Sequence, residues 1–377
     1  MIGGSSVPRR SRISRPPRGA RSGLAPNRHV SHPVMTAPLL EVRDLRIRFQ
    51  TRDGVARAAN GLSFHVSPGE TLALVGESGS GKSVAALAIL GLVHEPPGAV
   101  HGAILFRGED LRTMGDRALR SIRGSAVAMV FQEPMTALHP FMTAGDQIAE
   151  AIQIHGGTSR ASARARARSL LAQVGLPAPE ATADRYPHEL SGGMRQRVMI
   201  AMALASDPAL LIADEPTTAL DVTVQAQILA LLAGLRRTRG MAILLITHDL
   251  GVAAEIADRI AIVYAGRIVE TGSTTDVFAG PLHPYTQGLL AAVPRRGGAI
   301  GRLAAIPGAV PDPLALPAGC AFHPRCPLAT TDCRSAAPPA AELAPGRSAA
   351  CLHAGAVAFA PGGASWTPAM GDGGSSP

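Results

Sequence analysis

Lysine, aromatic side chains and long apolar runs are all scarce in this chain of 377 residues. Lys82 is the only lysine, so every other fixed positive charge on a side chain is an arginine. No apolar run reaches the roughly 18 residues that a membrane-spanning helix needs, and the longest, 84–93, is much shorter. The sequence therefore excludes a spanning helix, and we expect the chain to lie beside a membrane if a membrane is involved.

Cysteine is scarce too, and its position is informative. The four cysteines are clustered near the C-terminus, at Cys320, Cys326, Cys333 and Cys351. Nothing in the sequence indicates secretion, so a disulfide framework is not expected. The spacing contains no CxxC pair of the kind that zinc knuckles use. Because all the cysteines lie in one short segment, they indicate a shared ligand, and thiolates suit iron–sulfur or Zn²⁺.

The formal net charge of +8 is typical of nucleic-acid-binding proteins, but one segment carries most of it. Residues 1–37 contain seven arginines and no acidic residue, and removing those seven from the 36 basic residues leaves 29 against 28 acidic ones. Pro, Ser and Gly in this segment predict a disordered basic tail, with Met35 as the expected true start. Its composition resembles a transit peptide, but its prolines oppose an amphipathic helix. The nearly neutral remainder does not favour nucleic-acid binding.

One stretch fits the pattern G-x-x-x-x-G-K-[ST] between a short apolar run, 71–75, and a longer one, 84–92. We interpret these as a buried strand, a phosphate-binding loop and a helix, because such a turn directs backbone N–H groups and the helix dipole at one spot. Lys82 would reach the β- and γ-phosphates and Ser83 would ligate Mg²⁺. A glycine turn that matches by chance is the alternative. The residues predicted to bind ATP here are Gly76, Glu77, Ser78, Gly79, Ser80, Gly81, Lys82 and Ser83.

Three further apolar runs predict buried strands that end in polar residues. The runs are 126–131, 209–213 and 242–247, followed by Gln132, by Asp214 with Glu215, and by His248. Adjacent carboxylates downstream of a P-loop suit a division of labour, in which Asp214 holds Mg²⁺ and Glu215 orients or deprotonates water. Gln132 can reach a metal or that water, and His248 the γ-phosphate. A surface amide, a capping pair and a structural histidine are the ordinary alternatives.

A second anion site is indicated by Leu190-Ser191-Gly192-Gly193, which precedes an apolar helix over 198–205. Ser191 is a plausible N-cap, and the glycines expose the N–H groups of the first turn. Between 142 and 175 the pattern is helical, with three arginines at a spacing of four. These are Arg160, Arg164 and Arg168, which form either a solvated face or a contact with lipid headgroups or an acidic partner.

Alternation predicts strands over 39–51 and 61–66, and a hairpin over 259–272 around Ala265-Gly266. Phe49 lies in the first strand and could either stack on a nucleotide base or lie in the core. Shifts in composition predict the domain boundaries. The predicted segments are a disordered tail over 1–37, a nucleotide-binding domain over 38–280, a C-terminal extension over 281–353 and a disordered tail over 354–377.

The order of the motifs resembles that of ABC-transporter nucleotide-binding domains. Over about 39–272, the Walker A motif corresponds to 76–83, the Q-loop to Gln132, the signature to 190–193, Walker B to 210–215, the D-loop to Ala219-Leu220-Asp221 and the switch histidine to His248. The resemblance implies an α/β fold of the ABC-type P-loop NTPases. That fold has a mostly parallel core sheet, an antiparallel β-subdomain and a helical subdomain, here with a small cysteine-containing C-terminal extension.

The C-terminal part is similar to the extension of oligopeptide/dipeptide and nickel importer ATP-binding subunits. The similar stretches are 283–286, 306–308 and 317–327, together with 131–138, after which relatives commonly carry Asn at the position of His139. The resemblance implies an ATPase that energises import of di- or oligopeptides, with nickel, glutathione or another small solute as alternatives. It would be peripheral, at the cytoplasmic face of the cell membrane. Its expected partners are a second ABC ATPase subunit in a heterodimer, two membrane permeases and an extracytoplasmic solute-binding protein, with no nucleic acid.

The resemblance also assigns roles to the predicted site residues. Catalysis would rest on Glu215, His248 and Gln132, and the cofactors would be ATP and Mg²⁺, with the metal held by Ser83, Asp214 and Gln132. Phe49, which directly precedes an insertion at 50–57, is the candidate for stacking on adenine. Ser191, Gly192 and Gly193 would face the γ-phosphate bound by the second subunit, and Asp221 would lie at the dimer contact. For the cysteines the resemblance favours a 4Fe-4S cluster over zinc or four free thiols.

Two other classes of function use the same ATP motifs. A soluble ABC ATPase that acts on DNA or ribosomes is one, and the C-terminal extension and the near-neutral body oppose it. A regulatory module that binds ATP without turnover is the other, and the presence of both Glu215 and His248 opposes that.

Overall fold

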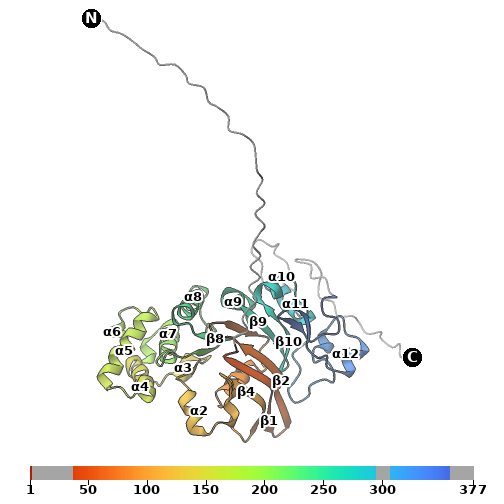
Figure 1. Cartoon of the computed structure of the whole chain (residues 1–377), viewed down its shortest axis with the longest axis horizontal. Helices are drawn as coiled ribbons and strands as arrows, with labels where there is room; N and C mark the ends of the chain where they lie inside the picture. Colours follow the sequence, from red (N-terminus) through yellow and green to blue (C-terminus); the bar gives the residue numbers. More distant parts are fainter. Residues whose placement is uncertain (2–36, 294–305, 357–377) are drawn as a thin grey trace, which may run out of the picture. The chain divides into compact units, whose positions relative to one another are not determined.

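The computed structural model describes residues 1, 37–293 and 306–356. The chain divides into two units, Met1–Thr36 and Ala37–Pro377, and every element below belongs to the second (Figure 1). The two predicted disordered tails lie, but for Met1, Ala37 and 354–356, outside the described residues. Within the described ranges, none of the helices has the length and apolar character to cross a membrane.

A mixed sheet of eight strands forms the core of the described chain, in the order β11-β12-β10-β9-β3-β8-β7-β6. Strands β9, β3, β8, β7 and β6 run parallel, as predicted, and β10, β12 and β11 continue the sheet antiparallel. The strands are β3 (Thr71–Val75), β6 (Val127–Val130), β7 (Leu210–Asp214), β8 (Ala242–Thr247), β9 (Arg259–Tyr264), β10 (Arg267–Ser273), β11 (Ala341–Ala344) and β12 (Arg347–Ala349). The predicted hairpin over 259–272 is confirmed as β9 and β10.

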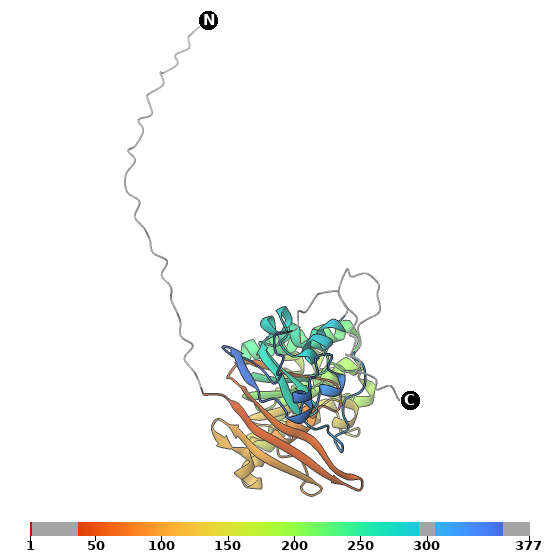
Figure 2. The same cartoon turned by 90° about the vertical axis from the view of Figure 1, so that its right-hand side faces the viewer.

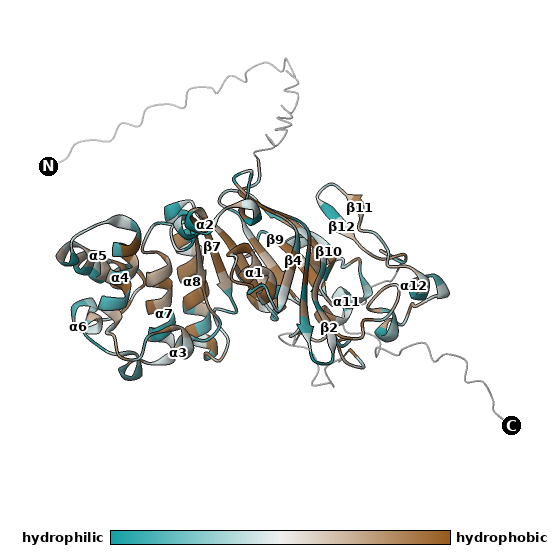
Figure 3. Ribbon diagram, turned by 90° about the horizontal axis from the view of Figure 1, so that it is seen from below, coloured by the Kyte–Doolittle hydropathy of each residue, from teal (hydrophilic) through white to brown (hydrophobic). Residues whose placement is uncertain are grey.

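The central strands are apolar throughout because both faces of the sheet are covered. All five residues of β3 are buried, and alternate residues point to opposite faces. Leu72 and Leu74 pack in a core with α1 and the N-terminal strands, whereas Ala73 and Val75 pack in a separate core with the helical subdomain. Figure 3 shows this concentration of hydrophobic residues on the central strands and on α1.

The N-terminal strands form a second, antiparallel sheet in the order β2-β1-β4-β5, seen at the lower left of Figure 2. The strands are β1 (Leu40–Thr51), β2 (Gly54–Val66), β4 (Gly98–Phe106) and β5 (Glu109–Asp110). The predicted strand over 61–66 is too short, since β2 begins at Gly54. Residues 54–60 lack apolar alternation, but their backbone continues the ladder with β1, in which Phe49 faces Ala56 and Arg48 faces Arg57.

The helices divide into those on the core sheet and those of the helical subdomain. The first group comprises α1 (Lys82–Ile89), α8 (Val222–Arg239), α9 (Leu250–Ile256), α10 (Thr274–Ala279) and α11 (Pro284–Ala291). The helical subdomain comprises α3 (Pro134–Ala137), α4 (Ala144–Gly156), α5 (Arg160–Gln173), α6 (Pro179–Ala183) and α7 (Gly192–Ala203). Two short helices, α2 (Asp116–Ile122) and α12 (Thr331–Ser335), lie in the β-subdomain and the C-terminal extension.

The arginines on α5 have an internal partner. Arg164 donates to both carboxylate oxygens of Asp146 on α4, and Arg160 lies 3.7 Å from the same carboxylate. Two of the three arginines predicted to share a face are therefore directed at a neighbouring helix of the same chain.

The C-terminal extension is hydrogen-bonded into the core sheet. Strand β12 pairs with β10, and Glu270 of β10 is fully buried beside it. The Glu270 carboxylate accepts hydrogen bonds from the N–H groups of Leu282 and His283, both at 2.8 Å, and lies 3.5 Å from the guanidinium of Arg347. The Glu270 carboxylate thus bonds to residues near both ends of the extension. The domain boundary at 280 stays a prediction.

Candidate functional site

The P-loop joins β3 to α1 and leaves no room for side chains at two of its glycines. A Cβ at Gly76 would lie 2.1 Å from the carbonyl oxygen of Val263, and one at Gly81 would lie 2.0 Å from that of Ala58. Gly81 also has a φ of 95°, in the left-handed region that glycine tolerates. These close approaches explain why glycine occupies both positions.

Lys82 is folded back into the loop. Its ammonium donates to the carbonyl oxygens of Gly76 and Glu77 at 2.8 and 2.9 Å, and to Ser80 Oγ at 3.1 Å. The side chain is only 4% exposed. Burial lowers the pKa of Lys82, and the nearby carboxylates of Glu215, Asp214 and Glu77 oppose that shift. Because this ammonium has little access to water, an anion bound in the loop would strongly stabilise its charged form.

The two predicted metal ligands from the P-loop and Walker B are in contact. Ser83 Oγ donates to Asp214 Oδ1 at 2.9 Å, which joins the start of α1 to the end of β7. Burial raises the pKa of Asp214, and the hydrogen bond from Ser83 opposes that shift. A hydroxyl and a buried carboxylate side by side form an oxygen donor set of the kind that Mg²⁺ prefers.

The three predicted catalytic residues meet at the carboxylate of Glu215. Gln132 Nε2 donates to Glu215 Oε2 at 3.0 Å, and His248 Nδ1 lies 3.2 Å from Glu215 Oε1. They follow β6, β7 and β8, neighbouring parallel strands whose carboxyl ends share one edge of the sheet. Thr218, which the sequence analysis missed, also donates to Glu215 at 2.8 Å. Glu215 has a φ of 44°, uncommon for a non-glycine residue and typical of functional sites.

The signature lies on different elements and is open to solvent. Ser191 caps α7 by accepting the N–H of Met194, as predicted, and both Ser191 and Gly192 are exposed. Asp221 caps α8 by accepting the N–H groups of Thr223 and Val224, each at 3.0 Å. Within the part of the chain that the structure describes, no hydrogen bond joins 191–193 to the P-loop. Their predicted roles toward a second subunit stay predictions.

Phe49 is half-buried and packs against the core that contains α1 and the β-subdomain. A Cβ at Gly98 would lie 3.3 Å from its ring, so β4 covers one side of the ring. Of the two interpretations, this placement favours a core residue, and the stacking role stays a prediction.

The C-terminal extension contacts the P-loop directly, which the sequence analysis did not predict. The N–H of Glu77 donates to the hydroxyl of Tyr285 at 3.0 Å, and Arg325 Nη1 lies 3.0 and 3.2 Å from the two Glu77 carboxylate oxygens. Arg325 also donates to the carbonyl oxygen of Pro307. Two of the chain's three tyrosines, Tyr264 and Tyr285, pack with Phe322 in one aromatic cluster beneath this contact. These residues are far apart in the sequence, so only tertiary packing reveals the cluster.

The four cysteines line one small cavity, of about 10 Å³, within the C-terminal extension, beside the start of α11. All four are free; the N–H of His353 donates to Cys351 Sγ at 3.3 Å, and the Thr330 hydroxyl lies 3.4 Å from Cys333 Sγ. Burial raises the pKa of Cys320 and Cys351 and raises that of Cys326 to about 12. Among the described residues, no group of three or more His, Cys, Asp or Glu is arranged so that it could hold a metal ion.

Comparison with known proteins agrees with this geometry. Residues 59–218 match the family model "ABC transporter", and residues 269–333 match "Oligopeptide/dipeptide transporter, C-terminal region". A probable peptide ABC transporter ATP-binding protein of Sinorhizobium fredii is 52% identical over 321 residues, covering 85% of this chain and 96% of the relative. A putative peptide import ATP-binding protein of Brucella melitensis is 51% identical, covering 84% and 97%.

The fold is also found among solved structures. A dimeric ATP-binding cassette in a post-hydrolysis state, bound to ADP and phosphate, superposes with a TM-score of 0.57 at 28% identity, covering 62% of this chain and 98% of that one. The predicted α/β cassette with an antiparallel β-subdomain and a helical subdomain is thereby confirmed. The chain belongs to the ABC transporter family, as an ATP-hydrolysing, ATP-binding subunit of the oligopeptide/dipeptide importer type.

Proposed function

We propose that this chain hydrolyses MgATP in a site shared with a second ATPase subunit and thereby drives import of di- or oligopeptides. The observation that carries the proposal is the contact of Gln132 and His248 with the Glu215 carboxylate, beside the Ser83–Asp214 pair. Glu215 follows β7, and residues that follow the two neighbouring strands contact its carboxylate. A base fixed in this way is positioned to orient water for attack on a phosphoryl group.

Each residue of the site has a defined task in this proposal. Lys82 pairs with the β- and γ-phosphates, exchanging its contact with the Glu77 carbonyl for phosphate oxygens. Ser83 and Asp214, together with Gln132, would hold Mg²⁺, which neutralises charge on the phosphates. Glu215 accepts the proton of the attacking water, and His248 contacts the γ-phosphate. Gln132 touches the base and begins the segment that enters the helical subdomain, so it can transmit the state of the site.

The signature supplies the second half of the site. Because Ser191 and Gly192 are exposed at the start of α7, they are free to meet a nucleotide bound by another subunit. The solved cassette that resembles this chain is dimeric. We propose a heterodimer with a second ABC ATPase, with Asp221 near the contact between the subunits.

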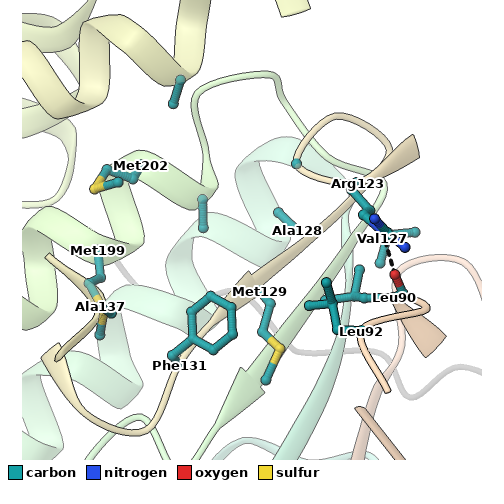
Figure 4. Close-up of a pocket in the computed structure, with 13 residues that line it drawn as sticks. Leu90, Leu92, Arg123, Val127, Ala128, Met129, Phe131, Ala137, Met199 and Met202 are labelled. Atoms are coloured by element: carbon teal, nitrogen blue, oxygen red, sulfur yellow. Dashed lines mark hydrogen bonds between the residues drawn. The ribbon is translucent and has the colours of Figure 1, made fainter. Parts of the chain in front are cut away.

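An apolar groove offers a surface for the membrane subunits. It has a volume of about 260 Å³ and lies between β6, the end of α1 and the helical subdomain, with Met129, Phe131 and Met199 directed into it (Figure 4). Phe131 is 40% exposed and directly precedes Gln132. We propose that a short helix of a permease occupies this groove. Such a helix would contact Phe131, and the next residue, Gln132, is bonded to the Glu215 carboxylate.

Capture of partners tests the importer assignment. The chain would be purified from gently solubilised native membranes and its partners identified by mass spectrometry. Two permeases, a second ATPase and a peptide-type solute-binding protein are expected, with the chain at the cytoplasmic face of the membrane. The variant Met202→Glu in the groove should lose the permeases, whereas Leu343→Glu on β11 should keep them. Recovery of ribosomal or DNA-repair proteins without permeases would move the function to a soluble ABC ATPase.

Peptide is the proposed solute because the relatives carry that assignment and the extension matches a peptide transporter region. Nickel, glutathione and other small solutes are tested by the same experiment, since the identity of the captured binding protein and its bound ligand separates them.

We further propose that the four cysteines hold a 4Fe-4S cluster. Four thiols line one cavity, and the N–H of His353 donates to one of the sulfurs. Such an arrangement is compatible with a cluster, whose potential depends on hydrogen bonds of this kind. A tetrahedral zinc site would need thiolates ~3.8 Å apart, given Zn–S of about 2.3 Å. No described group is arranged to hold a metal ion, so the thiols must move to bind either zinc or a cluster. A cluster binds each thiolate through a different iron and so spaces them further apart, but the cavity must also widen around it.

Spectroscopy and metal analysis test the cluster. Anaerobically purified protein should absorb near about 400 nm, as thiolate-bound clusters do, and Cys326→Ser should lose the band. Stoichiometric zinc without iron, or four titratable thiols without metal, would exclude the cluster.

A further inference from the structure

A cationic pocket of about 310 Å³ lies at the junction of the β-subdomain, the β9–β10 hairpin and the C-terminal extension. Four arginines and no acidic residue line it: Arg46, Arg48, Arg57 and Arg267. None of the residues 76–83 lines the pocket, so it is separate from the phosphate-binding loop.

Strand register concentrates this charge. Arg48 and Arg57 face each other directly across the β1–β2 pair, an arrangement of like charges that destabilises a sheet. Arg267 approaches from the hairpin, which β2 holds through a 2.7 Å hydrogen bond from the N–H of Asn60 to Gly266. The sheet therefore carries an electrostatic cost that a bound anion would remove.

Three of these four arginines have no carboxylate partner among the described residues. Arg46 is paired with Asp44 at 3.0 Å, but no ion pair joins Arg48, Arg57 or Arg267 to a carboxylate within the described ranges. Asp312 lies on the adjoining segment, where its carboxylate accepts the N–H of Leu314, and it does not line the pocket. Outside the described ranges, the sequence contains one acidic side chain, Asp372.

The extension turns this charged face into a pocket. The N–H of Arg57 donates to the carbonyl oxygen of Pro313 at 3.0 Å, so the extension pairs with the edge of β2, and Leu316 and Pro317 form part of the wall. Gly319 supports the turn of that wall, with a φ of 70° and with space for a Cβ blocked by the Cys333 carbonyl at 2.3 Å. The pocket thus has a defined boundary on both sides.

We propose that this pocket binds a small anion that carries phosphate groups. Guanidinium groups recognise phosphate through paired, charge-assisted hydrogen bonds, and three without a carboxylate partner in one concavity, beside Arg46, suit a ligand with more than one phosphate. The volume is at the small end of the range of about 300–1,000 Å³ found for ligand sites. A free polyphosphate and the phosphate groups of a nucleotide share this chemistry, so the test includes both.

Calorimetric titration with pyrophosphate and with ADP tests the site in the full-length chain carrying Lys82→Ala, which removes the lysine of the P-loop. Binding should persist in this variant. Adding Arg48→Ser and Arg57→Ser should weaken it by about tenfold or more, since charge-assisted bonds are lost. The matched control adds Arg117→Ser and Arg237→Ser, which remove the same charge from exposed positions elsewhere and should leave binding unchanged.

The pattern across probes decides the proposal. Tighter binding of ADP identifies a nucleotide, and preference for pyrophosphate identifies a polyphosphate; both support the site. Loss of all binding with Lys82→Ala alone, or an equal loss in the control, would overturn it. A melting temperature no lower than that of the unmodified chain, together with ATP bound at the P-loop when Lys82 is intact, shows that the Arg48→Ser/Arg57→Ser variant is folded. That measurement also keeps failure of this site distinct from failure of the ATPase assignment.

Discussion

Two helix N-termini in this chain carry glycine and serine suited to phosphate, and they are held in different ways. At α1, Lys82 is buried, Ser83 is bonded to Asp214, and Glu77 is bonded to Tyr285 and Arg325 of the extension. At α7, Ser191 caps its own helix, and Gly192 is exposed. The first site is organised within one chain, whereas the second is a surface. Under the proposed function, this subunit binds nucleotide through its own P-loop, and turnover requires the signature of a second subunit.

The sharpest separation of binding from turnover should come from Glu215→Gln. The amide keeps an oxygen acceptor for Gln132 and Thr218 but cannot take a proton from water, so hydrolysis should fall by about 10²–10⁴-fold while ATP binding persists. Phosphate release and ATP affinity would be measured in the assembled complex, where the variant should also trap a closed dimer. Glu150→Gln, on the exposed side of α4, is the matched control. Normal hydrolysis by Glu215→Gln would remove Glu215 from the mechanism.

Gly192→Asp tests the exposed site at the N-terminus of α7. A Cβ at this position meets only Leu220, at 3.6 Å, so the fold tolerates a side chain there. The new carboxylate would face phosphate bound by the partner, and turnover of the complex should drop by about tenfold or more, because like charges repel strongly at a poorly hydrated contact. ATP binding by the isolated chain should be unchanged. Gly192→Ala provides the neutral control, and a similar loss in both variants would indicate a steric effect.

The rigidity of the P-loop is tested by Arg325→Ala. Charged hydrogen bonds contribute about 1.5–3 kcal/mol each. The bonds from Arg325 fix Glu77 within the P-loop, so without them we expect ATP affinity to fall by roughly three- to tenfold. Turnover at saturating ATP should change less, because Arg325 does not touch the catalytic carboxylate. Tyr285→Phe, which keeps the ring and removes one neutral hydrogen bond, should have a smaller effect. A fall in turnover with unchanged affinity would contradict a role confined to positioning the loop.

The smallest effect expected is on the pH dependence of ATP binding. Burial lowers the pKa of Lys82 from 10.5, so the ammonium that binds phosphate is fully charged below this lowered pKa and is lost as pH rises through it. Affinity for ATP should therefore decline at a pH below that of an ordinary lysine. Lys82→Arg keeps its charge throughout, because the guanidinium pKa exceeds about 12, and its weaker binding should be flat over the same range. Parallel curves for the two proteins would assign the decline to another group.

Much of the site could be predicted because its residues follow buried strands. Gln132, Glu215 and His248 each come directly after a short apolar run, and parallel strands bring such positions to one edge. The contacts between Arg325 and Glu77 could not be predicted in this way, since 248 positions separate the two residues. Only tertiary packing joins them. The start of β2 was missed for a related reason, because backbone pairing with β1 maintains a stretch without apolar alternation.

The burial of Glu270 also determines how this chain can be cut. A chain that ended at the predicted boundary of 280 would lack Leu282, His283 and Arg347, so the Glu270 carboxylate would lose both of its N–H donors and the nearby guanidinium. It would also expose β10 as an unpaired edge strand, which favours aggregation. The ATP-binding part and its extension therefore fold as one piece, and a shortened protein intended for study of the nucleotide site alone should be insoluble.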